Sequence, residues 1–252
     1  MDLNAARISA LVDPLWDITV QSCVSSTNDL LKEWALQGAG AGTVLIAQSQ
    51  SAGKGRLGRS FYSPDGGVYL SLLLRPNVPA EETLFYTVAA AVAAADACEA
   101  VSDCQAKIKW VNDIYVNGKK VCGILSESVW SGKENAVIVG IGANLTTPKG
   151  GFPPDIAQKA GALPNVCKTA GTDFCITFLN RFAAFNKDFL THSFLPEYRR
   201  RSCLIGRAVT LKKGTQIFRG VAEDIDENAA LVLRLENGQA RAFSAGEVTT
   251  QI

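Results

Sequence analysis

Residues 51–61 read SAGKGRLGRSF, a stretch that concentrates three glycines and three cations within nine residues. Glycine costs backbone entropy and supplies no side chain for packing, so clustered glycines mark places where the backbone approaches something closely. Neighbouring cations repel one another unless an anion offsets them. We interpret the stretch as a loop that brings backbone amides and positive charge to an anionic ligand. The alternative is a solvated surface loop.

The segments on either side of this loop restrict the class of ligand-binding loop to which it can belong. Gly53, Gly55 and Gly58 fit the dinucleotide pattern G-x-G-x-x-G, but that pattern needs a helix after the loop. Here a turn at residues 61–67 leads into a β-type run at 68–74, so the order is strand, loop, strand. A Rossmann unit and a P-loop are thereby excluded. A kinase-like ATP-binding module is disfavoured because no HRD or DFG segment follows.

The length, net charge and composition are those of an ordinary globular protein. The 252 residues suit one large domain, or one with a small appendage, and a net charge of +1 gives no general attraction to nucleic acid or membranes. The seven cysteines form no C-x-x-C pair, and the single histidine, His192, has no nucleophile motif beside it. No signal peptide is visible, so we expect a cytoplasmic protein.

The remaining segments predict a larger domain followed by a small one. Helices are expected at residues 30–36, 81–100 and 174–190, and a buried strand at 43–47. Arg199, Arg200 and Arg201 are interpreted as a solvated cationic helix end. From residue 204 short β runs at 208–211, 216–222, 230–235 and 239–243 alternate with turns, which is typical of a small β-barrel. We therefore place the domains at 1–203 and 204–252.

Asn117-Gly118 between apolar runs is a strong hairpin signal. A two-residue turn there pairs Val116 with Lys119. Counting back from the turn places Lys109 and Lys120 on one face with Asp113, which indicates an anion site. The alternative is an edge strand protected by its lysines.

The same register sets Asn112 opposite Gly123, where the missing side chain leaves room for a ligand. A further buried strand at 136–145 carries Gly140, Gly142 and Asn144, and strand glycines mark close approach by a ligand or another backbone.

Five motifs in order resemble the biotin protein ligases, the biotin–[acetyl-CoA-carboxylase] ligases, in a short form without an N-terminal DNA-binding domain. They are S-T-N at residues 26–28, G-K-G-R-L-G-R at 53–59, K-W-V-N-D at 109–113, K-x-x-G-I-L at 120–125 and G-I-G-x-N at 140–144. The resemblance implies an α+β fold, with a mixed or antiparallel sheet covered by helices and a C-terminal SH3-like β-barrel. It also implies ATP and biotin as substrates, biotinyl-5′-AMP as intermediate, and a biotin carboxyl carrier protein as acceptor.

The resemblance also assigns residues. Biotin is expected to contact Ser26, Thr27, Asn28, Gln50, Gly53, Lys54, Gly55, Arg56, Lys120 and Gly123. ATP and the adenylate are expected to contact Arg56, Arg59, Phe61, Lys109, Asn112, Lys120 and Asn144. Arg56 and Lys120 are the expected catalytic cations. No metal ligands are assigned to the protein, because Mg²⁺ accompanies the ATP phosphates. The resemblance implies no DNA or membrane partner and leaves a homodimer open.

Three residues depart from the family pattern. Lys54 replaces the commoner arginine, Phe61 stands where a tryptophan stacks on adenine, and Val111 replaces a proline. None removes a charge that the reaction needs. The rival functions are a lipoate ligase or lipoyl transferase, which uses the same acyl-adenylate chemistry, and a transcription repressor with biotin as corepressor.

Overall fold

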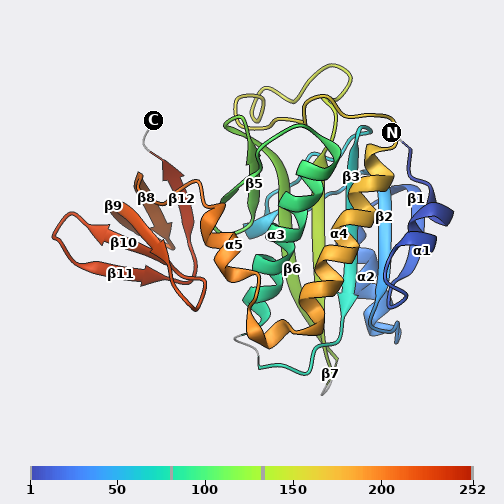
Figure 1. Cartoon of the computed structure of the whole chain (residues 1–252), viewed down its shortest axis with the longest axis horizontal. Coiled ribbons are helices and arrows are strands. Elements are labelled where there is room, and N and C mark those ends of the chain that lie inside the picture. The colour runs from blue at the N-terminus through green and yellow to red at the C-terminus, as the bar shows by residue number, and fades with distance from the viewer. Residues whose placement is uncertain (1, 80–81, 132–133, 251–252) are drawn as a thin grey trace.

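A computed structural model describes residues 2–79, 82–131 and 134–250. Its larger part is a seven-stranded mixed sheet in the order β1-β2-β3-β7-β6-β5-β4 (Figure 1). Only β1 and β2 pair in parallel; the other neighbours are antiparallel. The strands are β1 Asp17–Val24, β2 Thr43–Gln50, β3 Gly67–Leu74, β4 Lys107–Lys109, β5 Asp113–Val116, β6 Lys119–Ser131 and β7 Glu134–Asn144.

Helices cover both faces of this sheet. Helices α3 and α4 pack together on one face, and α2 lies on the other (Figure 1). The helices are α1 Ala5–Leu11, α2 Thr27–Leu36, α3 Thr83–Val101, α4 Ala170–Lys187 and α5 Leu195–Arg200, with 3₁₀ turns η1 Arg56–Gly58 and η3 Phe189–Thr191. The expected α+β class is therefore confirmed. Of the predicted helix at 81–100, Glu81 lies outside the described residues.

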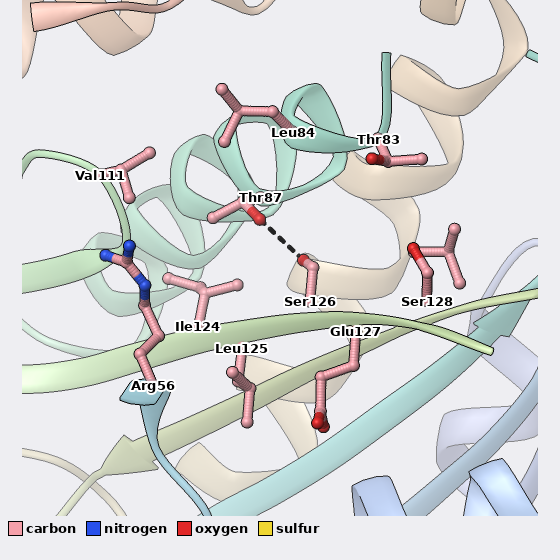
Figure 2. A pocket seen from close by; sticks show the side chains of 11 residues that line it. Arg56, Thr83, Leu84, Thr87, Val111, Ile124, Leu125, Ser126, Glu127 and Ser128 are labelled. Atoms are coloured by element: carbon pink, nitrogen blue, oxygen red, sulfur yellow. Dashed lines mark hydrogen bonds between the residues drawn. The ribbon is translucent and has the colours of Figure 1, made fainter. Parts of the chain in front are cut away.

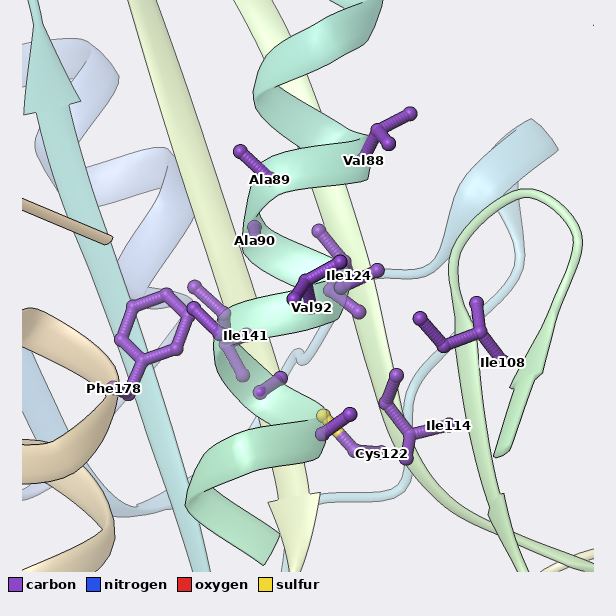
Figure 3. Packing of buried hydrophobic residues seen from close by; sticks show 14 of the residues in the cluster. Val88, Ala89, Ala90, Val92, Ile108, Ile114, Cys122, Ile124, Ile141 and Phe178 are labelled. Carbon is purple, nitrogen blue, oxygen red and sulfur yellow. The ribbon is translucent and has the colours of Figure 1, made fainter. Parts of the chain in front are cut away.

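Helix α3 is apolar almost all round because it is buried almost all round. Val88, Ala89 and Val92 belong to one buried cluster with Ile124 and Ile141 of the sheet and Phe178 of α4 (Figure 3). The helix has the length and composition of a membrane span, but 72% of its most apolar window is buried inside the protein. We therefore assign α3 to the core of the protein.

The C-terminal part forms a separate five-stranded antiparallel sheet in the order β11-β10-β9-β8-β12. Its strands are β8 Ala208–Lys213, β9 Gln216–Ile225, β10 Leu231–Leu235, β11 Ala240–Phe243 and β12 Glu247–Thr250. The first four match the predicted β runs. Strand β12 was not predicted, nor was β1, the edge strand of the large sheet.

The interpretation of the arginine run as a solvated helix end is wrong for Arg201. Its side chain is 6% exposed and forms ion pairs with Asp96, Glu99 and Glu197, so it joins α3 to α5. A buried guanidinium needs such partners, because the cost of removing the charge from water must be offset.

This cluster predicts a pH effect on stability. The pKa of Glu197 is lowered from 4.5 to about 2, chiefly by the hydrogen bond from Arg200. Burial of the carboxyl raises the pKa, and the hydrogen bond from Arg201 lowers it further. A carboxyl with a depressed pKa stabilises the fold above its unfolded pKa, and this contribution is lost as pH falls toward 2. In urea unfolding, wild type should be more stable than Glu197→Gln at pH 6, and the difference should shrink below pH 4.5. A difference that is constant with pH would contradict this prediction.

Candidate active site

All the predicted site residues line one cavity of about 990 Å³ on the α2 face of the large sheet. Its walls come from the start of α2, the loop at residues 51–64, the ends of β4 to β7, and the connection at 152–160. The C-terminal sheet adds residues 246–249. Segments that are far apart in the sequence thus meet at this cavity.

The side chains on this face of the sheet change from large and apolar beneath α2 to small or polar toward the cavity. Leu73 and Ile138 lie beneath α2 as an apolar row. Two residues further along, Ser71 pairs with Gly140, and two further again Tyr69 pairs with Gly142. Because side chains alternate along a strand, these rows share one face. The row with Gly142 continues through Gly123 and Asp113 to Lys109.

The glycines of this face make room for other side chains. A Cβ on Gly142 would lie 2.6 Å from the Phe61 ring, and one on Gly123 would lie 3.2 Å from it. A Cβ on Gly140 would lie 2.0 Å from Asn28 Oδ1. The space beside the glycines of the 136–145 strand is thus filled by two side chains, those of Phe61 and Asn28, and not by another backbone. The Phe61 ring also makes an edge contact with Tyr69, with centroids 6.4 Å apart.

A row of polar groups begins where α2 begins. Ser26 caps the helix, its Oγ accepting a hydrogen bond from the Asp29 N–H at 3.3 Å. The Thr27 N–H donates to Gln50 Oε1 at 2.8 Å, and Gln50 Nε2 donates to Ser63 Oγ at 3.0 Å. These contacts fix the Gln50 amide beside the cavity.

The cations of the glycine loop each contact an anion or an amide oxygen. Lys54 Nζ donates a hydrogen bond to Asp29 Oδ1 at 2.8 Å, and this hydrogen bond raises the pKa of the lysine. Arg56 donates to Asn112 Oδ1 at 3.1 Å. Arg59 reaches Glu247 of β12 at 2.5 Å. The loop is therefore tied to α2, to the β4–β5 turn and to the C-terminal sheet.

The lysines of the hairpin lie on the cavity side as predicted. Lys120 Nζ is 2.7 Å from Asp113 Oδ1, an ion pair without hydrogen-bond geometry, and 5.7 Å from the centre of the Phe61 ring. Lys109 Nζ lies 5.5 Å from the centre of the Tyr115 ring. The hairpin thus presents two ammonium groups beside Phe61 and Asp113.

The predicted pairing of Asn112 with Gly123 is wrong. A bulge between Ile114 and Tyr115 shifts the register, so Asp113 faces Gly123. Asn112 instead lies in the turn before β5, where its Nδ2 donates to the Ile124 carbonyl at 2.8 Å. Its Oδ1 accepts the hydrogen bond from Arg56.

A second, smaller cavity of about 270 Å³ lies on the other side of β6, against the start of α3 (Figure 2). Arg56 lines both cavities, and in Figure 2 its guanidinium lies beside Val111. On this side Thr87 Oγ1 donates to Ser126 Oγ at 2.8 Å. Arg56 therefore lies at the boundary between the two faces of the sheet.

Sequence reasoning missed two cavity walls. The connection at 152–160 carries no recognised motif, yet it lines the cavity and its Lys159 carbonyl accepts a hydrogen bond from the Lys120 N–H at 2.8 Å. Glu247, the partner of Arg59, lies in a domain without a recognised motif. His192 lies elsewhere, stacked on Phe85 and paired with Glu82. Among the described residues no cluster of three or more His, Cys, Asp or Glu suits a metal ion.

Comparisons with known proteins agree with this geometry. Residues 20–144 match the biotin/lipoate A/B protein ligase family, and residues 204–249 match the biotin protein ligase C-terminal domain. The bifunctional ligase/repressor BirA of Bacillus spizizenii is 34% identical over 232 residues, covering 89% of this chain and 71% of that protein. The biotin–[acetyl-CoA-carboxylase] ligase of Paracoccus denitrificans is 35% identical over 217 residues, covering 81% and 88%.

A solved structure extends the match to three dimensions. The Aquifex aeolicus biotin protein ligase in complex with biotin and ATP superposes with a TM-score of 0.79 and 27% identity, covering 93% of this chain and 98% of that one. The five motifs, the two sheets and the relatives all lead to one conclusion: this chain belongs to the biotin protein ligase family.

Proposed function

We propose that this chain activates biotin with ATP to biotinyl-5′-AMP and transfers the biotinyl group to a lysine of a biotin carboxyl carrier protein. The observation that carries the proposal is the convergence of a polar row, a glycine-lined face and loop cations on one cavity. The relatives that are named as biotin–[acetyl-CoA-carboxylase] ligases support the same reaction.

The first step joins two anions. A biotin carboxylate oxygen attacks the α-phosphorus of ATP, the bond to the β-phosphate breaks, and pyrophosphate leaves. Fixed cations offset the repulsion and stabilise the charge that develops at the transition state. In our proposal Arg56 leaves Asn112, and Lys120 leaves Asp113, to reach the junction of the two substrates.

The cavity divides between the substrates in this proposal. Biotin takes the end formed by Ser26, Thr27, Asn28, Gln50, Gly53, Lys54, Gly55 and Gly123. ATP takes the end formed by Arg59, Phe61, Lys109, Asn112 and Asn144, and the Phe61 ring also borders the biotin end where it lies against Gly123. Mg²⁺ arrives on the ATP phosphates, where Asn112 Oδ1 is the kind of oxygen ligand that Mg²⁺ accepts. Arg56 and Lys120 serve both substrates.

In the second step the amine of the acceptor lysine attacks the carbonyl of the mixed anhydride. The new amide bond forms as the bond to AMP breaks, and the amine loses a proton. The products are a biotinylated carrier protein and AMP.

Mass spectrometry tests the proposed function directly. Incubation with biotin, ATP and Mg²⁺ should give biotinyl-AMP. When a biotin carboxyl carrier domain is added afterwards, the mass of that domain should increase by one biotinyl group. The same incubation with lipoate is the control for the rival ligase. Lipoyl-AMP in place of biotinyl-AMP would contradict the proposal.

The glycine loop is expected to tighten when biotin binds. Its backbone closes on itself through Gly55 N–H to the Arg59 carbonyl at 2.7 Å, yet Leu57 at its tip is 74% exposed. Trypsin should cut after the loop cations several times more slowly with biotin present. Cleavage after Lys149, in an exposed connection, should keep its rate. Equal loop cleavage with and without biotin would contradict this prediction.

Self-association is also part of the proposal. Among the described strands, none pairs with residues 126–131 of β6 on the side away from β7, so this edge is open to a strand of a second copy. Sedimentation with and without biotin and ATP measures whether two copies associate.

We also propose a domain boundary between Cys203 and Leu204 and a cytoplasmic location. No DNA partner is expected for residues 1–252, given their net charge of +1. Salt-dependent retardation of duplex DNA would contradict that expectation.

A further inference from the structure

Ser71 of β3 is a fully buried hydroxyl to which no role has been assigned above. Its Oγ lies 2.7 Å from Thr27 Oγ1 and 2.6 Å from Asn28 Oδ1. Thr27 and Asn28 are themselves only 4% exposed. Ser71 therefore connects the sheet to the polar row at the start of α2.

The orientation of the Asn28 amide follows from its other partners. Nδ2 lies 2.8 Å from Glu127 Oε2 and 3.2 Å from the Leu125 carbonyl. Both partners are acceptors, so the amide N–H groups must face them, and Oδ1 must face Ser71. Gly140 keeps this arrangement open, because a Cβ there would lie 2.0 Å from Oδ1.

The direction of the hydrogen bonds now follows from counting protons. Ser71 has one hydroxyl proton, and Asn28 Oδ1 cannot donate, so that proton goes to Asn28. The Thr27 hydroxyl then donates to Ser71 Oγ at 2.7 Å. It does not donate to Gln50 Oε1, which is farther away at 3.1 Å and already accepts the Thr27 N–H. What Thr27 Oγ1 retains is a lone pair, so it is an acceptor.

We propose that Ser71 and Glu127 are positioning residues that make the Thr27 hydroxyl an acceptor and so select a ligand with an N–H donor at this point. The bicyclic urea of biotin carries two N–H groups, whereas the dithiolane ring of lipoate carries none. The chain Glu127–Asn28–Ser71–Thr27 is thus a specificity device. This inference rests on the proposed function.

The test is a comparison of ligands across matched variants. Ser71→Ala removes the proton that orients the chain. Ser126→Ala is the control, because it removes a hydroxyl from an analogous hydroxyl pair with Thr87 on the opposite face of the sheet (Figure 2). The ligands are biotin, ATP, and the two carbamate analogues of biotin in which one ureido N–H or the other is replaced by oxygen. Calorimetry measures each affinity.

Wild type should bind one carbamate analogue much more weakly than biotin. In Ser71→Ala biotin affinity should fall about tenfold, since a buried acceptor loses its donor and Thr27 is free to rotate. The ratio of biotin to analogue affinity should fall with it, while ATP affinity stays within about twofold. Ser126→Ala should leave the biotin affinity, the ratio of biotin to analogue affinity and the ATP affinity unchanged. A merely structural role of Ser71 would not change the ratio between two nearly isosteric ligands.

The outcomes separate the two proposals. If wild type does not bind biotin, the proposed function fails. If wild type binds biotin and Ser71→Ala keeps the wild-type ratio, only the present inference is overturned. Should Ser71→Ala fail to fold by circular dichroism, Ser71→Cys, whose thiol is a weak donor, replaces it, with a smaller fall in the ratio expected. An unchanged ratio in that variant overturns the inference equally.

Discussion

Lys120→Ala should lower the rate of biotinyl-AMP formation by about a hundredfold to a thousandfold, the usual cost of removing one preorganised group that stabilises transition-state charge. The side chain is 30% exposed and its main partner is Asp113, so its loss leaves no large buried void. The fold should survive. Pyrophosphate release in a single turnover, with saturating biotin and ATP, measures the effect.

Lys213→Ala is the matched control, because Lys213 is an exposed lysine at the end of β8. It should keep the wild-type rate, and both variants should melt within a few degrees of wild type. A Lys120→Ala protein that releases pyrophosphate at the wild-type rate would remove Lys120 from the catalytic assignment.

Gly142→Ala should weaken biotin binding about tenfold or more. The added Cβ would lie 2.6 Å from Phe61 Cε1 and 3.0 Å from its Cζ, so the ring must move. Gly123 and Tyr69 also lie against the ring, so the ring can move only into the cavity. Overpacking of this kind costs about 1–3 kcal/mol, and 1.4 kcal/mol corresponds to a factor of ten in affinity.

Gly40→Ala serves as the control, because a Cβ there meets no atom within 4 Å. It should bind biotin as wild type does. If calorimetry gives Gly142→Ala the same biotin affinity as Gly40→Ala, the Phe61 ring does not border the biotin site.

The features that sequence reasoning found are those with local causes. The glycine loop shows its role in its own composition, and the turn at Asn117-Gly118 fixes the pairing of Val116 with Lys119, which the structure confirms. Counting along the hairpin placed Lys109, Lys120 and Asp113 on one face, and all three line the cavity. Each of these signals lies within a few residues of its effect.

The features that it missed depend on distant partners. The bulge beside Tyr115 places Asp113 in the position that was predicted for Asn112, and no residue type in this segment indicates such a bulge. Arg201 is buried because Asp96 and Glu99, a hundred residues earlier, lie beside it. Glu247 reaches the loop only because the C-terminal sheet docks there. None of these contacts leaves a periodic pattern in the sequence.

The central claim is that cations from the glycine loop and from the hairpin meet where biotin and ATP are joined. A crystal structure with biotin and a non-hydrolysable ATP analogue tests it most directly. We predict that Arg56 and Lys120 leave Asn112 and Asp113, so that both contact the biotin carboxylate or the α-phosphate. Arg56 still on Asn112 and Lys120 still on Asp113, with both substrates bound, would contradict the account.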